Sequence, residues 1–200
     1  MQDYKFYKYE YVKDILETEI NIILKEFERK NGYLPVEHVK SRLKTKTSIN
    51  NKLLKKGLNQ KDEQSLKNIS DIVGIRIVVS FISDVYDLVS EIYKSKNIKI
   101  KEKKDYILNP KDTGYTSYHL KVEVPLHLNG KKEYIPAEIQ IRTVAMDFWA
   151  SLDHKIRYKF PEHVPKEVEK EIKNYAEDIR KLDRRMYELN KIINKYNKKL

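Results

Sequence analysis

The most constraining feature of this sequence is a pair of alternating segments on either side of Asn129-Gly130. The first segment, SYHLKVEVPL (residues 117–126), and the second, EYIPAEIQIR (residues 133–142), place an apolar side chain at every second position along most of their length. Successive side chains of a β-strand point to opposite faces, so the pattern predicts two strands with one buried face. Asn-Gly favours a tight hairpin turn, and the two strands are therefore expected to pair antiparallel.

The second of these strands carries an unusual set of polar side chains. In AEIQIRT (residues 137–143), isoleucines alternate with Glu138, Gln140 and Arg142. If the isoleucines enter a core, a carboxylate, an amide and a guanidinium line up on the opposite face. What this polar face binds must be judged from the rest of the chain.

The remaining pattern predicts an α+β domain with a mixed, largely antiparallel sheet flanked by helices. Pro35 is expected to open a second helical stretch after the first helix. The lysine-rich segment 41–67 should be broken at Gly57, and segment 97–105 should begin as a strand and end as a cationic loop. The other expected elements are a helix over 11–30, a strand over 71–81, and helices over 84–95 and 143–158.

The last part of the chain predicts one long helix that begins near Pro165. Its apolar residues recur at steps of four and three between many charged side chains, which is a heptad pattern. Such a helix should pack lengthwise against another helix, either in this chain or in a second copy. The apolar positions are Val168, Ile172, Tyr175, Ile179, Leu182, Met186, Leu189, Ile193 and Tyr196.

Composition narrows the function classes. The 200 residues include 41 Lys and Arg against 30 Asp and Glu, a formal net charge of +11, so an anionic partner is expected: nucleotide phosphates, nucleic acid or an acidic membrane surface. The absence of cysteine excludes disulfides and thiolate metal sites, and fits a reducing cytoplasm. No apolar leader region and no run near 20 apolar residues occurs, so a cytoplasmic protein without a membrane segment is expected.

Common phosphate-binding and metal motifs are missing. The five glycines form neither GxGxxG nor GxxxxGK[ST], and no HExxH occurs, so phosphate must be bound by cationic side chains. Asp71 and Glu138 stand out as acids beside apolar strand residues, where an unpaired carboxylate is costly. They could act locally: Asp71 could pair with Arg76 or cap a strand, and Glu138 could pair with Arg142. Alternatively, both acids could hold one Mg²⁺ that also binds substrate phosphates.

A second cluster, KDTGYTSYH (residues 111–119), combines a glycine with aromatic and basic residues. Gly114 permits a sharp turn, after which Tyr115 lies between Lys111 and His119. An aromatic ring near hydrogen-bond donors can stack on a nucleotide base. With 15 tyrosines in the chain, a core position for Tyr115 is the competing interpretation.

Five blocks now point to a family. Together, and in this order, they resemble the RelA/SpoT-type synthetase domain over residues 39–160, and most closely the stand-alone small alarmone synthetases. Any single block would be weak evidence, whereas five in sequence are specific. The blocks are DIVGIRI (71–77), KDYI (104–107), GYTSYH (114–119), EIQIRT (138–143) and MDFWASLDHK (146–155).

This resemblance implies transfer of the β,γ-pyrophosphate of ATP to the ribose 3′-hydroxyl of GTP or GDP, which yields (p)ppGpp and AMP. Asp71 and Glu138 match the magnesium-binding acids, and Glu138 is also the residue assigned to activate the hydroxyl. The implied ATP-binding residues are Arg42, Lys44, Lys52, Arg76 and Lys104. The implied GTP/GDP-binding residues are Lys111, Tyr115, His119, Gln140, Asp147, Asp153 and His154.

Three of these positions depart from the pattern of some relatives. Lys104 stands where some carry an arginine over adenine, and lysine lacks the planar stacking group. Asp147 replaces an asparagine, and Asp153 replaces a glutamate. The preference among acceptor nucleotides is therefore left open. Without the resemblance, Asp147 and Asp153 read equally well as solvated helix positions, and Arg142 as a structural ion-pair partner.

The expected organisation has three parts: N-terminal helices over 1–38, the synthetase domain over 39–160 and an oligomerisation helix over 161–200. The resemblance implies a homo-oligomer, most simply a tetramer, and a synthetase without a hydrolase half. The alternative function is a basic RNA-binding module, which predicts binding that weakens steeply with salt and that does not need Glu138. Some relatives also bind RNA, so RNA binding would not by itself exclude synthesis.

Overall fold

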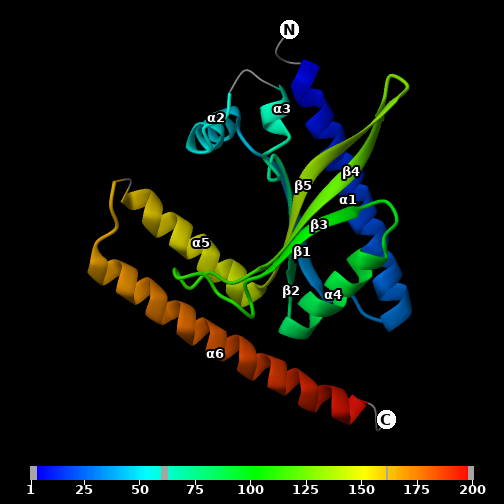
Figure 1. Cartoon of the computed structure of the whole chain (residues 1–200). Helices are drawn as coiled ribbons and strands as arrows, with labels where there is room; N and C mark the ends of the chain where they lie inside the picture. Colours follow the sequence, from blue (N-terminus) through cyan, green and yellow to red (C-terminus); the bar gives the residue numbers. More distant parts are fainter. Residues whose placement is uncertain (1–3, 60–62, 161, 198–200) are drawn as a thin grey trace.

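A five-stranded sheet forms the centre of the protein. The computed structural model describes residues 4–59, 63–160 and 162–197 (Figure 1). The strand order is β1-β2-β5-β4-β3; β2 and β5 run parallel, and the other three neighbouring pairs are antiparallel. The predicted mixed, largely antiparallel α+β fold is confirmed. The strands are β1 (Val36–Leu43), β2 (Val73–Val79), β3 (Lys99–Asp105), β4 (Tyr118–Leu128) and β5 (Lys131–Thr143).

The predicted hairpin is the longest pairing in the sheet. Strands β4 and β5 pair from Tyr118 opposite Ile141 to Leu128 opposite Lys131. Asn129 and Gly130 both have positive φ, 50° and 73°, as a two-residue turn between twisted strands requires. The alternation read from the sequence therefore fixes which side chains of both strands share a face.

Two helices cover one face of the sheet. Helices α1 (Tyr4–Asn31) and α4 (Ile82–Lys94) pack against it and enclose the main hydrophobic core. Leu16 and Ile20 of α1 and Leu88 of α4 are fully buried there, with the apolar parity of β2, β4 and β5. The opposite, polar face of the sheet is thus the one left for a site.

The prediction of a second helix after Pro35 is wrong, because this segment is strand β1, antiparallel to β2. Val36, Val39 and Leu43 follow one another at steps of three and four, which imitates a helical stripe. The register shifts between Val36 and His38, and this irregularity compensates the odd step. All three apolar side chains are then partly buried against the same core.

The expected cationic loop before Asp105 is also wrong, since β3 continues as a strand to this residue. Lys103 and Lys104 pair with Leu120 and His119 of β4. The side chain of Asp105 ends the strand, because it accepts hydrogen bonds from the backbone N–H groups of Ile107 and Leu108. Pairing with β4 thus fixes the position of Lys104.

The remaining helices are α2 (Lys46–Lys55), α3 (Glu63–Leu66), α5 (Val144–Lys159) and α6 (Lys166–Asn197). Figure 1 shows them around the sheet, with α3 beside the start of α1; α5 and α6 pack on each other, and α6 also contacts α4. Thr143 caps α5 directly after β5, since its hydroxyl accepts a hydrogen bond from the Met146 N–H. Within the described residues, no helix has the length and apolar character that a membrane crossing needs.

Helix α6 is buried along only part of its apolar stripe. Ile172 and Ala176 pack on Trp149 of α5 in a second, small core. Further along, Leu182, Met186, Leu189, Ile193 and Tyr196 are between 41% and 69% exposed. The predicted long helix is confirmed within residues 166–197; positions 161 and 198–200 of the predicted segment lie outside the described residues.

Candidate active site

Residues from all five strands meet on the polar face of the sheet. Paired positions in neighbouring strands point to the same side, so the register can be followed across the sheet. One row runs from Arg42 through Gly74 and Glu138 to Lys121 and Glu102, and the next from Lys40 through Arg76 and Gln140 to His119 and Lys104. The strand pairing thus brings Glu138 and Glu102, the Gln140 amide and several cations together on one surface.

Asp71 is held by two lysines just ahead of β2. Lys44 donates to Oδ2 at 3.0 Å, and Lys52 of α2 lies 2.9 Å from Oδ1. Burial by itself raises the pKa of Asp71, but the hydrogen bonds and charges of Lys52 and Lys44 outweigh it and lower the pKa below its ordinary value. The carboxylate is therefore ionised at neutral pH. The local pairing with Arg76 that the sequence allowed is not formed.

Glu138 is held by His119 and Gln140 rather than by Arg142. His119 Nδ1 lies 3.2 Å from Oε1, and Gln140 Nε2 donates to Oε2 at 2.7 Å. Burial raises the pKa of Glu138, whereas the hydrogen bond and charge of His119 and the hydrogen bond of Gln140 lower it, and the pKa is lowered overall. Asp71 acts against this by repulsion, which places the two acids within electrostatic reach of each other.

Asp147 forms ion pairs with the two arginines Arg76 and Arg142 of this face. Its Oδ1 accepts from Arg142 at 3.0 Å and pairs with Arg76 at 3.1 Å. The Asp147 side chain is only 14% exposed, so the reading of a solvated helix position is wrong. The ion pairing that the sequence assigned to Asp71 and Glu138 is instead made by Asp147, from the first turn of α5.

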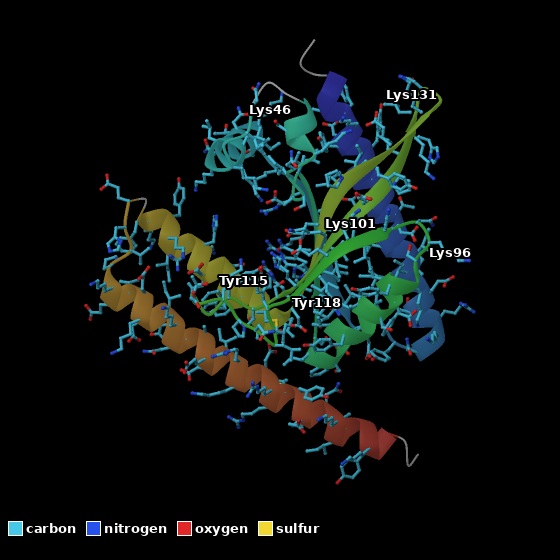
Figure 2. The ribbon with its side chains drawn as sticks, in the orientation of Figure 1. Lys46, Lys96, Lys101, Tyr115, Tyr118 and Lys131 are labelled. Carbon is cyan, nitrogen blue, oxygen red and sulfur yellow. The ribbon has the colours of Figure 1, made fainter. Side chains whose placement is uncertain are left out.

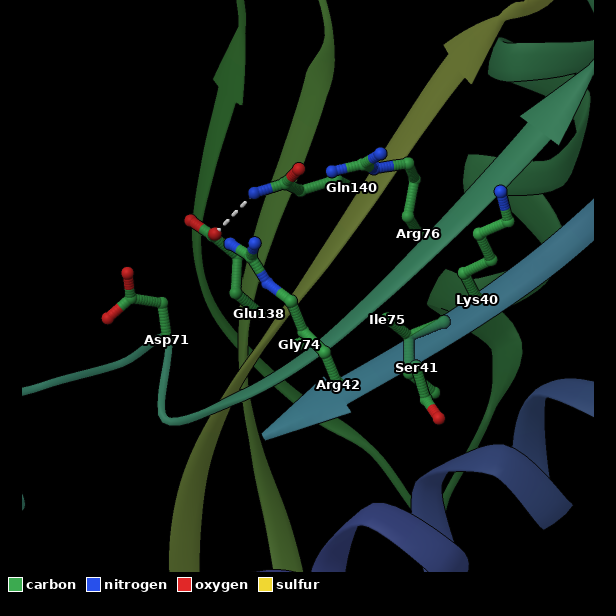
Figure 3. A pocket seen from close by; sticks show the side chains of 9 residues that line it. All are labelled: Lys40, Ser41, Arg42, Asp71, Gly74, Ile75, Arg76, Glu138 and Gln140. Carbon is green, nitrogen blue, oxygen red and sulfur yellow. Dashed lines mark hydrogen bonds between the residues drawn. The ribbon is translucent and has the colours of Figure 1, made fainter. Parts of the chain in front are cut away.

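Two adjoining cavities open on this surface, with volumes of about 280 Å³ and 380 Å³. Both are bordered by Asp71, Glu138 and Gln140. The first also contains Arg42 and Arg76, and Figure 3 shows the Arg42 guanidinium extending over Gly74 toward Glu138. The second adds the residues Lys52, Glu102, Lys104, Tyr106, Lys111, Tyr115, His119 and Lys121. The acids therefore lie where the two cavities meet.

Aromatic rings form one wall of the second cavity. Tyr115 contacts the rings of Tyr106, His119 and Trp149, and Lys111 Nζ lies 4.9 Å from the centre of the Tyr115 ring. Figure 2 shows Tyr115 where the loop before β4 meets α5 and α6. Tyr115 is thus neither a simple core residue nor free, and it lies where a flat base could stack.

Three predicted acceptor residues, Asp147, Asp153 and His154, lie outside both cavities, and so does the predicted ATP-binding residue Lys44. Asp153 is paired with Arg157 one helical turn further along α5, at 2.8 Å, and His154 is exposed. Lys40, Glu102, Tyr106 and Lys121 line the cavities without having been predicted. Strand parity offered a signal for Lys121, two positions after His119, whereas Lys40 and Glu102 depended on strands whose extent the sequence did not show.

Two ionised acids between cation-lined cavities define a site for polyphosphate nucleotides, in the class of phosphoryl-transfer domains. The family described as "Region found in RelA / SpoT proteins" matches residues 41–163, and the chain belongs to this family.

Relatives match over almost the whole chain. GTP pyrophosphokinase YwaC of Bacillus subtilis (strain 168) is 45% identical over 193 residues, 96% of this chain and 92% of that protein. The crystal structure of small alarmone synthetase 2 from Bacillus subtilis superposes with a TM-score of 0.85 at 44% identity and covers 95% and 98% of the two chains. Small alarmone synthetase 1 from the same organism, bound to its product pppGpp, gives 0.84 at 30% identity, with 92% and 94% covered.

Proposed function

We propose that this chain transfers the β,γ-pyrophosphate of ATP to the ribose 3′-hydroxyl of GTP or GDP. The 3′-hydroxyl loses its proton, which is released to solvent, and its oxygen forms a bond to the β-phosphorus. The bond from this phosphorus to the α,β-bridging oxygen breaks, and AMP leaves with that oxygen. The observation that carries the proposal is that ionised Asp71 and Glu138 border both cavities, so two nucleotides can meet at them. The related GTP pyrophosphokinase and the synthetase bound to pppGpp support the same reaction.

The position of the cations supports a donor nucleotide on the side of Asp71. Arg42 and Arg76 line the first cavity, with Lys44 and Lys52 beside Asp71, and Lys104 lies across the second cavity. Pyrophosphoryl transfer places charge on several phosphate oxygens, and fixed cations stabilise that charge. Arg76 offers a planar group for adenine, while the lysines act as point charges on the phosphates.

The acceptor nucleotide belongs in the second cavity. Tyr115 stacks on guanine, Lys111 neutralises its phosphates, and Gln140 and His119 keep Glu138 in place. A carboxylate offers about four lone-pair positions, so Glu138 can accept a further hydrogen bond from the 3′-hydroxyl. Asp147 contributes through Arg76 and Arg142. Asp153 and His154 would contact the acceptor only at the outer edge of this region.

The two acids fit a Mg²⁺ ion. Oδ1 of Asp71 lies 2.9 Å from Lys52 Nζ, and because a carboxylate oxygen has two lone pairs, one of them remains for a cation. In the described part of the chain, no three His, Asp or Glu residues gather as a metal site. Mg²⁺ is usually bound by one or two carboxylates plus substrate phosphates, which suits Asp71 and Glu138. When bound, the ion supplies positive charge for the transferred group.

We also propose that α6 joins copies of this chain into a homo-oligomer, most simply a tetramer. The stripe from Leu182 to Tyr196 leaves five large apolar side chains at least 41% exposed. The heptad spacing and the alternation with charged residues suit a second α6 better than a flat surface. Helix α6 packs on α5 through Ile172 and Ala176 and also contacts α4, but these contacts leave the stripe from Leu182 to Tyr196 exposed.

The test is an assay with purified protein, Mg²⁺, labelled ATP and GDP, GTP or GMP, followed by separation of the nucleotides. We expect guanosine 3′-pyrophosphate products and AMP in equal amounts, and their loss in Glu138→Gln. Glu91→Gln is the matched control, because Glu91 forms ion pairs with Lys30 and Lys94 on the α4 surface. If the folded chain makes no product and instead binds RNA with steep salt dependence, the RNA-binding alternative is correct.

A further inference from the structure

A buried guanidinium lies on the same face of β5 as Glu138 and Gln140. Arg142 is 4% exposed, although arginine is rarely buried to this degree. It donates to Asp147 at 3.0 Å, to the Tyr115 hydroxyl at 2.6 Å and to Gln140 Oε1 at 3.0 Å, with a longer bond to Ser117 at 3.4 Å. Its charge is balanced by Asp147, but two of its bonds are directed toward the neighbours of Glu138.

The first path runs through Tyr115 and His119. Arginine can only donate hydrogen bonds, so the Tyr115 oxygen accepts from Arg142 and its own proton is free for His119 Nε2, 2.8 Å away. At the other end, the Glu138 carboxylate accepts the hydrogen bond, so His119 Nδ1 carries the proton that faces it. Both ends require the same tautomer, and every hydrogen bond of this path points toward Glu138.

The second path runs through Gln140. Arg142 Nη2 donates to the amide oxygen, which leaves the amide nitrogen to face Glu138 Oε2 at 2.7 Å. An inverted amide would bring two donors together at Arg142 and two acceptors together at Glu138. The guanidinium therefore also fixes the orientation of Gln140. The two paths end on different oxygens of the same carboxylate.

We propose that Arg142 is a positioning residue for the transfer reaction: through Tyr115 with His119, and through Gln140, it orients hydrogen-bond donors onto both oxygens of Glu138. This inference deepens the proposed function and rests on it. Arg142 lines neither cavity, so it acts without touching the nucleotides. A lysine cannot replace it, because a single ammonium lacks the planar fork that reaches Asp147, Tyr115 and Gln140 together.

The direction of the hydrogen bonds can be measured without any activity. Nitrogen-15 NMR of the histidines in the folded, ligand-free protein, at a pH where the imidazole is neutral, distinguishes the two tautomers; His119→Gln assigns the signal. We expect a protonated Nδ1 and an accepting Nε2 for His119. A protonated Nε2 with an unprotonated Nδ1 would contradict the first path from Arg142 to Glu138, whether or not the protein makes product.

Kinetics test whether Arg142 acts through its neighbours. We expect Arg142→Lys to lower kcat about 10- to 100-fold while KM for ATP stays within about twofold, since Glu138 is misplaced but the ATP residues remain. Tyr115→Phe keeps the ring and removes one hydrogen bond, for a loss of about fivefold in kcat. Because Arg142→Lys already breaks this path, adding Tyr115→Phe should change kcat by less than about twofold.

The outcomes are distinct. The proposal is wrong if the loss in kcat of the double variant equals the product of the losses of Arg142→Lys and Tyr115→Phe. It is also wrong if Arg142→Lys leaves kcat unchanged. Arg180→Lys on α6, whose arginine pairs with Glu177, is the control for an arginine-to-lysine change away from the site. If Arg142→Lys does not fold, Tyr115→Phe must still lower kcat. A native chain that makes no product refutes the proposed function. The tautomer of His119 then remains the test of the hydrogen-bond path from Arg142 to Glu138.

Discussion

Gly114 couples the loop that carries Tyr115 to helix α6, and a Gly114→Ala substitution should expose this coupling. Gly114 has φ +88°, in the region that residues with a Cβ avoid. An added Cβ would lie 2.4 Å from the Cβ of Ala176, whereas carbon atoms in contact normally lie about 3.5–4.0 Å apart. Ala176 is itself 2% exposed, so neither the loop nor the helix can yield freely.

The expected cost follows from two contributions. The left-handed backbone costs about 1–2 kcal/mol for a residue other than glycine, and overpacking costs about 1–3 kcal/mol. Gly114→Ala should therefore lower the free energy of unfolding by about 2–5 kcal/mol. Gly130→Ala is the matched control: its φ is +73° and no atom lies within 4 Å of an added Cβ, so it should incur the backbone cost alone.

The assay is urea denaturation followed by circular dichroism at one fixed protein concentration. Ala176→Gly alone should cost about 1 kcal/mol, as glycine does within a helix. In the double variant Gly114→Ala/Ala176→Gly, the clash is removed and about 1–3 kcal/mol should be recovered relative to additive costs. Additive costs, or equal losses for Gly114→Ala and Gly130→Ala, would refute the contact between this loop and α6.

Three further predictions follow from the site, the exposed stripe and one buried acid. Asp71→Asn should lower kcat/KM at least about 100-fold, while the circular dichroism spectrum stays unchanged. The reason is that Lys44 and Lys52 lose their charged partner and the site loses an oxygen ligand. Retained activity would exclude Asp71 from the reaction. Met186→Glu with Leu189→Glu should shift the chain to smaller species in sedimentation, because two exposed apolar side chains of the α6 stripe become charged; an unchanged mass would place the interface elsewhere. Burial outweighs the hydrogen bond from Thr143 and raises the pKa of Asp183 from 3.8 to about 6, so its contribution to stability is present below about pH 4 and is lost as the pH rises through about 6. The free energy of unfolding of Asp183→Asn should therefore rise relative to that of the native chain by up to about 3 kcal/mol between about pH 4 and pH 7. If urea denaturation gives a difference between the two proteins that does not change with pH, the prediction is wrong.

The hairpin and the parity of its side chains could be predicted well, because both depend on residues close in sequence. Asn129-Gly130 fixes the turn, and each apolar position of β4 and β5 follows the period of two. The same local logic found α1, α4, α5 and α6. It failed at β1, where the steps between Val36, Val39 and Leu43 match a helix and only pairing with β2 selects a strand.

Some residues of the candidate site could be predicted from the sequence, and others could not. The sequence singled out Asp71, Glu138 and Tyr115 from their unusual surroundings, and the structure brings all three to the same pair of cavities. Their assigned roles remain predictions. Asp153 and His154 were inferred from the motif alone, and the structure leaves them outside the cavities because they lie beyond the first turns of α5.

The sequence by itself determined the alternating strands, the amphipathic helices and the identity of the two acids, because these depend on spacing and residue type. Only the tertiary structure decided the partners of the charges. Asp71 takes Lys44 and Lys52 rather than Arg76, and Arg142 takes Asp147 while His119 and Gln140 take Glu138. An ion pair or hydrogen bond forms wherever strand order and register bring two groups within about 3 Å, and the parallel pairing of β2 with β5 joins segments more than 60 residues apart.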